Sequence, residues 1–197
     1  VMHSQAGAAA ATACEFRTAH ELTLWPLEIT QVEYFTQAAD LPLAAMPEWR
    51  RYRSGLRLRV RTTAGADFSK IALRDLRLHC SGIDDVAYRL HELVCGHALG
   101  VLVMPAQRPA TWHEAFDADC IEPAGFEDDQ ALLPQSLAGF QGFRLLQEYF
   151  AFPQRFLFFD LCDIGQALRE SEQTGELQAA PSYGKPLAFG DGYDDTP

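Results

Sequence analysis

The sequence lacks the short motifs that identify many enzymes. It has no glycine-rich phosphate loop, no GxSxG motif and no dinucleotide-binding fingerprint; such motifs place a nucleophile or a row of N–H groups in a reactive site. Its five cysteines include no CxxC pair, so reduced thiols are a simpler interpretation than a disulfide framework. These absences favour a protein that is not an enzyme and that carries no cofactor.

Long apolar runs are absent as well. No stretch approaches the roughly 20 apolar residues that a membrane-spanning helix needs. The opening VMHSQAGAAAATA has neither the positive nor the leucine-rich part of a signal peptide. We therefore expect a cytoplasmic chain without membrane insertion, in which residues 1–15 form a flexible N-terminal segment.

Basic residues are missing from the interval between Arg108 and Arg144, which holds seven acidic residues. Nine of the 16 basic residues lie between Arg50 and Arg77. The net charge of −11 argues against nucleic acid as a partner, because affinity for phosphate comes from clustered Lys and Arg. This distribution predicts a basic sheet face and an acidic loop region.

The sequence also contains several strand patterns. The stretch LRLRVR at 56–61 alternates apolar residues with arginine, as a half-buried strand does. A similar alternation at 76–80 predicts its antiparallel neighbour, and the valine-containing run from Ala98 to Met104 predicts a buried strand. The segment from Phe16 to Phe35 fits two strand segments, or one kinked strand, interrupted at Trp25 and Pro26.

Two segments have helical spacing. The first runs from Asp84 to Cys95, with Asp84 or Asp85 as its cap and Gly96 closing it. The second runs from Phe140 to Phe150. These patterns predict an α+β fold of mostly antiparallel strands packed with two main helices, in a domain at 16–161. For the divergent segment 162–197 we expect a short helix, within 170–178, followed by a partly mobile tail.

Eight of the 13 phenylalanines lie between Gly125 and Leu161. Phe143, Leu146 and Phe150 repeat at helical spacing and predict one apolar face, with Arg144 and Glu148 on the other. Pro153 ends the helix and predicts a strand over 155–161. We expect the three apolar residues to be buried together with Phe156 and Phe158. An unchanged melting temperature in Phe158→Ala would instead indicate a partner-binding aromatic surface.

The same region resembles a known family. GFEDDQALLP followed by FQGFRLLQEYFAFPQRFLFFDL is closely similar to the signature of the TssF family, also called VasA or ImpG, of the bacterial type VI secretion system. FRTAHELTLWPLEITQVEYF and the stretch at 55–103 resemble it too. The resemblance extends from Phe16 to Leu161 in the family's order, which is too long for a chance match. The chain is much shorter than usual members, which indicates a segment or a truncated member.

This resemblance implies a structural function in a cytoplasmic baseplate wedge. Members of the family work beside TssG, with two TssF copies per TssG, and contact the TssK adaptor and sheath or spike components. The family is not known for enzymatic activity, in agreement with the missing motifs.

The candidate partner interface consists of Arg57, Arg59 and Arg61. If the residues between them face the core, all three guanidinium groups project from the opposite side of the strand, where they suit bidentate contacts with acidic groups. Two alternatives are a solvated outer face and neutralisation by the chain's own acidic stretch from Glu114 to Asp129.

A different class of function is a metal-dependent hydrolase that uses His91, Cys95 and His97. His91 and Cys95 are four residues apart, the ligand spacing of HExxH metalloproteases. However, the second position is not histidine, no third ligand is recognisable, and a buried thiol beside satisfied histidines explains the pattern as well.

Overall fold

The computed structural model describes residues 2–3, 14–16, 18–19, 23–36, 54–63, 65–107, 110–133, 140–170 and 174–181. Most of the strands form two antiparallel sheets. The larger sheet has the order β3-β4-β10-β6-β7 and the smaller one the order β5-β9-β8, while β1 pairs with β2. The strands are β1 (Met2–His3), β2 (Glu15–Phe16), β3 (Leu27–Phe35), β4 (Gly55–Thr62), β5 (Leu76–His79), β6 (Ala98–Pro105), β7 (Glu114–Asp117), β8 (Ile121–Pro123), β9 (Phe158–Leu161) and β10 (Thr174–Pro181).

The helices lie between these strands in the chain. Together with the antiparallel sheets they confirm the predicted α+β fold. The α-helices are α1 (Asp84–His97), α2 (Gln141–Ala151) and the short α3 (Gly165–Glu170). The 3₁₀ helices are η2 (Phe68–Lys70), η3 (Ala118–Cys120), η4 (Asp128–Gln130) and η5 (Pro153–Leu157).

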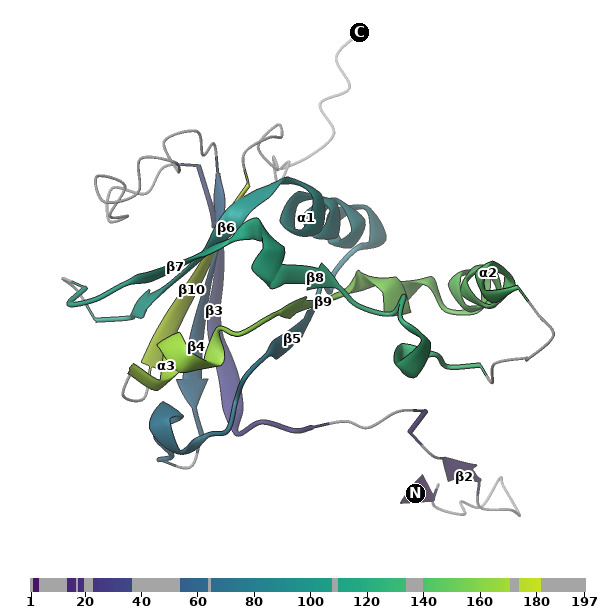
Figure 1. Ribbon diagram of the computed structural model, residues 1–197, viewed down its shortest axis with the longest axis horizontal. Coiled ribbons are helices and arrows are strands. Elements are labelled where there is room, and N and C mark those ends of the chain that lie inside the picture. Colours follow the sequence, from purple (N-terminus) through teal and green to yellow (C-terminus); the bar gives the residue numbers. More distant parts are fainter. Residues whose placement is uncertain are drawn as a thin grey trace, which may run out of the picture.

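The core lies on one face of the larger sheet. There α1 packs against β10 and β6, α3 packs against β6, and buried side chains of β4 and of the smaller sheet belong to the same cluster (Figure 1). Helix α2 lies at the far end of the smaller sheet, away from the larger one (Figure 1). Apolar side chains from most of these elements are buried together: Leu56, Leu58, Val60, Phe68, Leu76, Leu78, Ala87, Val94, Val101, Val103, Leu157, Phe159, Leu161, Ile164 and Leu168.

The predicted strand at 56–61 is confirmed as β4. Leu56, Leu58 and Val60 are buried and the arginines between them are not. The prediction that the strand at 76–80 pairs with this strand is wrong. β4 pairs with β3 and β10, whereas β5 pairs with β9 in the smaller sheet. Local alternation shows that a segment is a strand, but the pairing partner depends on contacts distant in sequence.

The prediction of a short helix within 170–178 is also wrong. Helix α3 ends at Glu170, and β10 occupies the centre of the larger sheet, where its backbone pairs with β4 on one side and β6 on the other. A central strand receives hydrogen bonds from two neighbours, so its own propensity counts for less. The division of the chain at 161 stays a prediction.

The segment after α2 differs from its expectation in one respect. The strand expected over 155–161 begins only at Phe158, because Pro153–Leu157 forms η5. Proline fits the first turn of a helix, where its missing N–H has no partner to lose. The strand is central in the smaller sheet, between β5 and β8.

The predicted helix from Asp84 to Cys95 is confirmed as α1, but its cap and its last residue differ from the prediction. Asp84 and Asp85 lie in its first turn rather than capping it, since Ile83 is the N-cap and makes no side-chain cap hydrogen bond. Carboxylates in the first turn still interact favourably with the helix dipole. Gly96 does not close the helix, which continues to His97.

Candidate protein-binding surfaces

Two of the three arginines of β4 lie opposite glutamates of β3, and Arg59 lies opposite Gln31. Glu28 is directly across from Arg61 and Glu33 from Arg57. The Arg61 Nη2 to Glu28 Oε2 distance is 2.7 Å, and the Arg57 Nη1 to Glu33 Oε2 distance is 3.7 Å. Opposite charges that face one another across two strands stabilise the pairing. The basic face is therefore compensated by β3.

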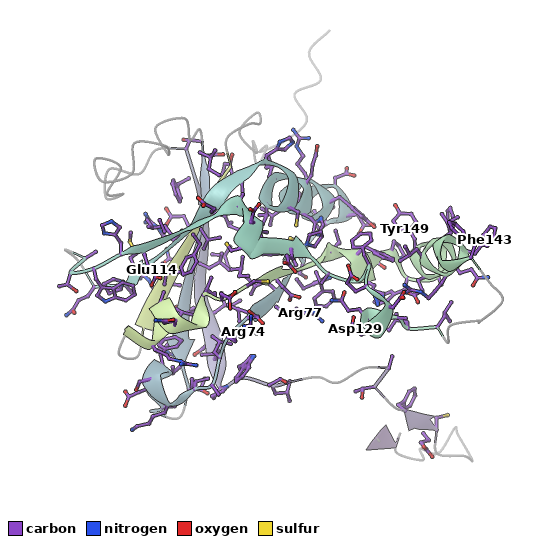
Figure 2. All side chains as sticks on the ribbon, viewed as in Figure 1. Arg74, Arg77, Glu114, Asp129, Phe143 and Tyr149 are labelled. Carbon is purple, nitrogen blue, oxygen red and sulfur yellow. The ribbon has the colours of Figure 1, made fainter. Side chains whose placement is uncertain are left out.

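The acidic stretch from Glu114 to Asp129 does not gather over these arginines. Glu114 belongs to β7 at the edge of the larger sheet, whereas Asp129 lies in η4 near α2 (Figure 2). The acidic residues of 114–129 are thus divided between distant parts of the molecule and do not form a single loop region.

Accessibility differs among the three arginines. The Arg57 side chain is 15% exposed, and its guanidinium lies 5.1 Å from the centre of the Phe35 ring. Arg59 is half-buried, and its carbonyl oxygen accepts a hydrogen bond from the Thr30 hydroxyl. The Arg61 side chain is 55% exposed. Of the candidate interface, Arg61 is therefore the arginine most open to a partner.

His91 and Cys95 lie together on α1, as their spacing predicted. The Cys95 Sγ to His91 Nε2 distance is 3.5 Å, and the same ring nitrogen lies 3.3 Å from the Phe158 carbonyl oxygen. Burial lowers the pKa of His91, partly opposed by that carbonyl, and burial raises the pKa of Cys95 to about 11. A protonated thiol is a poor nucleophile and a poor metal ligand.

His97 does not join this pair. Its Nε2 lies 4.0 Å from Glu92 Oε1 on the exposed side of α1. Within the part of the chain that the structure describes, no group of three His, Cys, Asp or Glu residues is placed to hold a metal ion. Nor does any helix among these residues have the length and apolar character needed to cross a membrane.

The face of α2 predicted to be exposed is the buried one. Glu148 and Arg144 are 2% and 7% exposed. Glu148 Oε1 accepts hydrogen bonds of 3.0 Å from the backbone N–H groups of Leu132 and Leu133, and one of 3.2 Å from Arg144 Nη1. Its second oxygen lies 3.3 Å from Arg155 Nε. We call Arg144, Glu148 and Arg155 the buried ion cluster.

The buried ion cluster fixes the ionisation of Glu148. Burial alone would raise the pKa of this carboxyl, but the N–H groups of Leu133 and Leu132, together with Arg144 and Arg155, hold it below its usual value. Arg144 Nη2 also lies 3.4 Å from both Phe126 O and Asp128 Oδ1. The cluster therefore joins α2 to the segment before it and to η5 after it.

Sequence reasoning missed the cluster, although one signal was present. Arg144 and Glu148 are four residues apart, the spacing of ion pairs along one helix face. That spacing is common on solvated faces. The N–H groups that donate hydrogen bonds to the buried Glu148 carboxylate belong to the loop residues Leu132 and Leu133. The position of these two residues cannot be deduced from local periodicity.

Two cavities lie near the smaller sheet, and Arg77 lines both of them. The first, about 170 Å³, is also lined by Phe152 and Arg155, and the second, about 420 Å³, by Arg74 and Asp160. Arg77 is already held by Asp160 through hydrogen bonds of 2.7 and 2.6 Å. Because its charge is compensated, Arg77 does not indicate an anion site.

Comparison with known proteins agrees with the sequence resemblance. A family model described as "Type VI secretion system, TssF" matches residues 1–180. The chain belongs to the TssF family. It is 42% identical over 185 residues to the type VI secretion system component TssF1 of Pseudomonas aeruginosa, an alignment that covers 93% of this chain and 29% of that protein.

The fold is also found in a solved structure. The chain is similar, with a TM-score of 0.70 and 23% identity, to a chain in the cryo-electron microscopy structure of the TssK-TssF-TssG baseplate subcomplex of the type VI secretion system. The similarity covers 91% of this chain and 31% of that chain. The chain thus spans less than a third of the length of either relative.

Proposed function

We propose that this chain is part of a structural subunit of a type VI secretion baseplate and that it acts by binding other proteins. The observation that carries the proposal is membership of the TssF family over nearly its whole length. The fold similarity to a chain of a TssK-TssF-TssG subcomplex supports TssG and TssK as partners. A second TssF copy, and sheath or spike components, belong to the proposal as the family resemblance implies them.

The same proposal assigns the protein to the cytoplasm and gives it no enzymatic role. Two residues of α1 support the absence of an enzymatic role, because His91 is half-buried against a backbone carbonyl and Cys95 has a raised pKa of about 11. A protonated thiol is a poor nucleophile and a poor metal ligand.

The arginines of β4 are proposed as one contact of this assembly. Arg61 contributes the most accessible guanidinium, and Glu28 is its present ion-pair partner. Exposed ion pairs of this type contribute about 0–1 kcal/mol. An acidic group of a partner could therefore replace or extend the pair at little cost, and the planar guanidinium would favour bidentate contacts.

Co-purification tests the proposed function. The chain is co-expressed with its cognate TssG and TssK, one partner carrying the affinity tag, and the complex is analysed by size-exclusion chromatography with light scattering. We expect the chain to elute with TssG, TssK or both in a fixed ratio. A folded chain that elutes alone, at all protein concentrations tested, contradicts the proposal.

A further inference from the structure

Helix α2 presents its apolar side chains to solvent, which contradicts the predicted burial of this face. Phe143 is 64% exposed, Leu146 55% and Phe150 81%, and Phe140 just before the helix is 74% exposed. The Phe140 and Phe143 rings contact edge to face, with centroids 5.8 Å apart. We call these four residues the α2 apolar face. Figure 2 shows Phe143 at the outer end of the molecule, beyond Tyr149.

The size of the α2 apolar face sets it apart from scattered exposed residues. Each aromatic side chain carries about 150–250 Å² of surface, so the face amounts to roughly 500 Å². Patches of about 300–600 Å² are the largest on a typical monomer and are often functional. Of the expected core phenylalanines, only Phe156 is buried, while Phe158 is half-buried.

The orientation of α2 is held from its other side. A surface helix normally turns its apolar stripe toward the core, but here Arg144 and Glu148 occupy that position. Rotating the helix would separate Glu148 from the N–H groups of Leu132 and Leu133 and from Arg155. Breaking a buried charge pair is strongly destabilising, because it leaves an uncompensated buried charge. The apolar face therefore stays outward within the part of the chain that the structure describes, where it is open to a binding partner.

An acidic turn lies next to this helix. It consists of Glu127 and the η4 residues Asp128 and Asp129, all exposed, and Arg144 connects it to α2 through the 3.4 Å contact with Asp128. The chain as a whole carries a net charge of −11. Because Arg144 is on the buried side of α2, the turn flanks the helix rather than continuing the apolar face. A protein that covers the apolar face and extends around the helix to the turn meets negative potential there, which favours a basic partner.

We propose that the α2 apolar face and the acidic turn form one docking surface for a different protein, whose matching surface is apolar at its centre and carries Lys or Arg at its edge. A stable interface buries about 800 Å² per partner, more than the apolar face alone supplies, so the partner must extend onto the flanking turn. A second copy of this chain fits less well, because two copies would bring the same net negative charge together.

The proposal rests on the proposed function only in the choice of probes, which are purified cognate TssG and TssK. The variant Phe143→Gln/Phe150→Gln is compared with two control variants, Ile83→Gln and Leu24→Gln, whose residues are also exposed, at 79% and 84%, but lie outside α2. All variants are first checked for an unchanged melting temperature. Binding to each probe is then measured by biolayer interferometry.

We expect the α2 variant to weaken binding to one probe by at least about tenfold, as loss of central aromatic anchors does, while the controls bind normally. The variant Glu127→Lys/Asp129→Lys should slow association and reduce its salt dependence. Unchanged binding by the α2 variant, or an equal loss in the controls, overturns this inference and leaves the proposed function intact. Failure of the unmodified chain to bind either probe overturns both. A homodimer that Phe143→Gln/Phe150→Gln dissociates would overturn the choice of a different protein as occupant.

Discussion

Glu148 Oε2 lies 3.3 Å from Arg155 Nε, and the two side chains are only 1% and 7% exposed. This contact joins α2 to η5, and with Arg144 it replaces the apolar packing that normally holds a surface helix. A buried ion pair adds little net stability, since desolvation offsets its Coulomb energy, but it specifies one orientation. The position of the α2 apolar face follows from that orientation.

The first prediction concerns Glu148→Gln. The substitution keeps the shape of the side chain but removes the charge that faces buried Arg155, and it leaves Arg144 with only Asp128, 3.4 Å away, as a counter-charge. We expect the free energy of unfolding to fall by about 3 kcal/mol, measured by urea denaturation. The control is Glu92→Gln on α1, where the Arg89 pair is 44% and 52% exposed and its loss should cost less than about 1 kcal/mol. Equal effects of the two substitutions would contradict a special role for the cluster.

The pH dependence of stability follows from the same carboxyl. The folded state lowers the pKa of Glu148 from its ordinary value of 4.5. Its contribution is therefore fully present above about pH 4.5 and is lost as the pH falls below that value and through the lowered folded pKa. The difference in unfolding free energy between the unmodified chain and Glu148→Gln should shrink on acidification. A difference that stays constant down to about pH 3 would show that the charge of Glu148 is unimportant.

The orientation of α2 also shows what periodicity can and cannot predict. Spacing identified the helix to within one residue at each end and identified its two faces. It did not identify which face is buried, because that depends on Leu132 and Leu133 reaching Glu148 from a loop. Hydrophobicity favoured Phe143 and Phe150 as core, and the buried ion cluster outweighed it.

The sheets show the same division between local and long-range information. Alternation at 56–61 correctly predicted that Leu58 is buried and its arginine neighbours are not. The glutamates that pair with Arg57 and Arg61 come from β3, at a register that no local pattern specifies. The sequence could predict the candidate site as a row of positive charges. It could not predict that glutamates of β3 neutralise two of them, because that depends on how the strands pair.

A second stability prediction concerns Gly165 at the start of α3. A Cβ at this position would overlap the carbonyl oxygen of Leu73 and lie 2.6 Å from its carbon. Since these are backbone atoms, the chain itself must move, and we expect Gly165→Ala to lower the unfolding free energy by about 1–3 kcal/mol.

The matched control for this test is Gly96→Ala. Gly96 lies inside α1, and apart from its chain neighbours and the backbone of its own helix no atom lies within 4 Å of the position of a new Cβ. Alanine there should be neutral or stabilise by up to about 1 kcal/mol, because it reduces the freedom of the unfolded chain and favours the helix. Thermal denaturation monitored by circular dichroism compares the two. If Gly165→Ala melts at or above the temperature of Gly96→Ala, the close approach of α3 to Leu73 is incorrect.

Charge removal on β4 tests the proposed arginine contact. The variant Arg57→Gln/Arg59→Gln/Arg61→Gln should keep its circular dichroism spectrum, because Leu56 and Val60 still supply the buried side of the strand. We expect weaker assembly with TssG and TssK and a shallower dependence of affinity on salt. Arg89→Gln on α1 is the control for a general loss of positive charge. Retained affinity together with a retained salt dependence would show that the arginines form a solvated face.

The last prediction concerns Cys95 and distinguishes a structural thiol from a zinc ligand. Burial raises the pKa of Cys95 to about 11 and that of Cys80 to about 12, so both thiols stay protonated near neutral pH. Zinc binds the thiolate, and its binding would have to release that proton. Protein purified without a histidine tag should therefore contain no stoichiometric zinc, as measured by inductively coupled plasma mass spectrometry. Labelling with a thiol reagent should be slow at Cys95 and faster at Cys14, which is exposed. One equivalent of zinc that disappears in Cys95→Ser, with His91 left unchanged, would contradict the structural assignment and would favour a metal-dependent hydrolase at His91, Cys95 and His97.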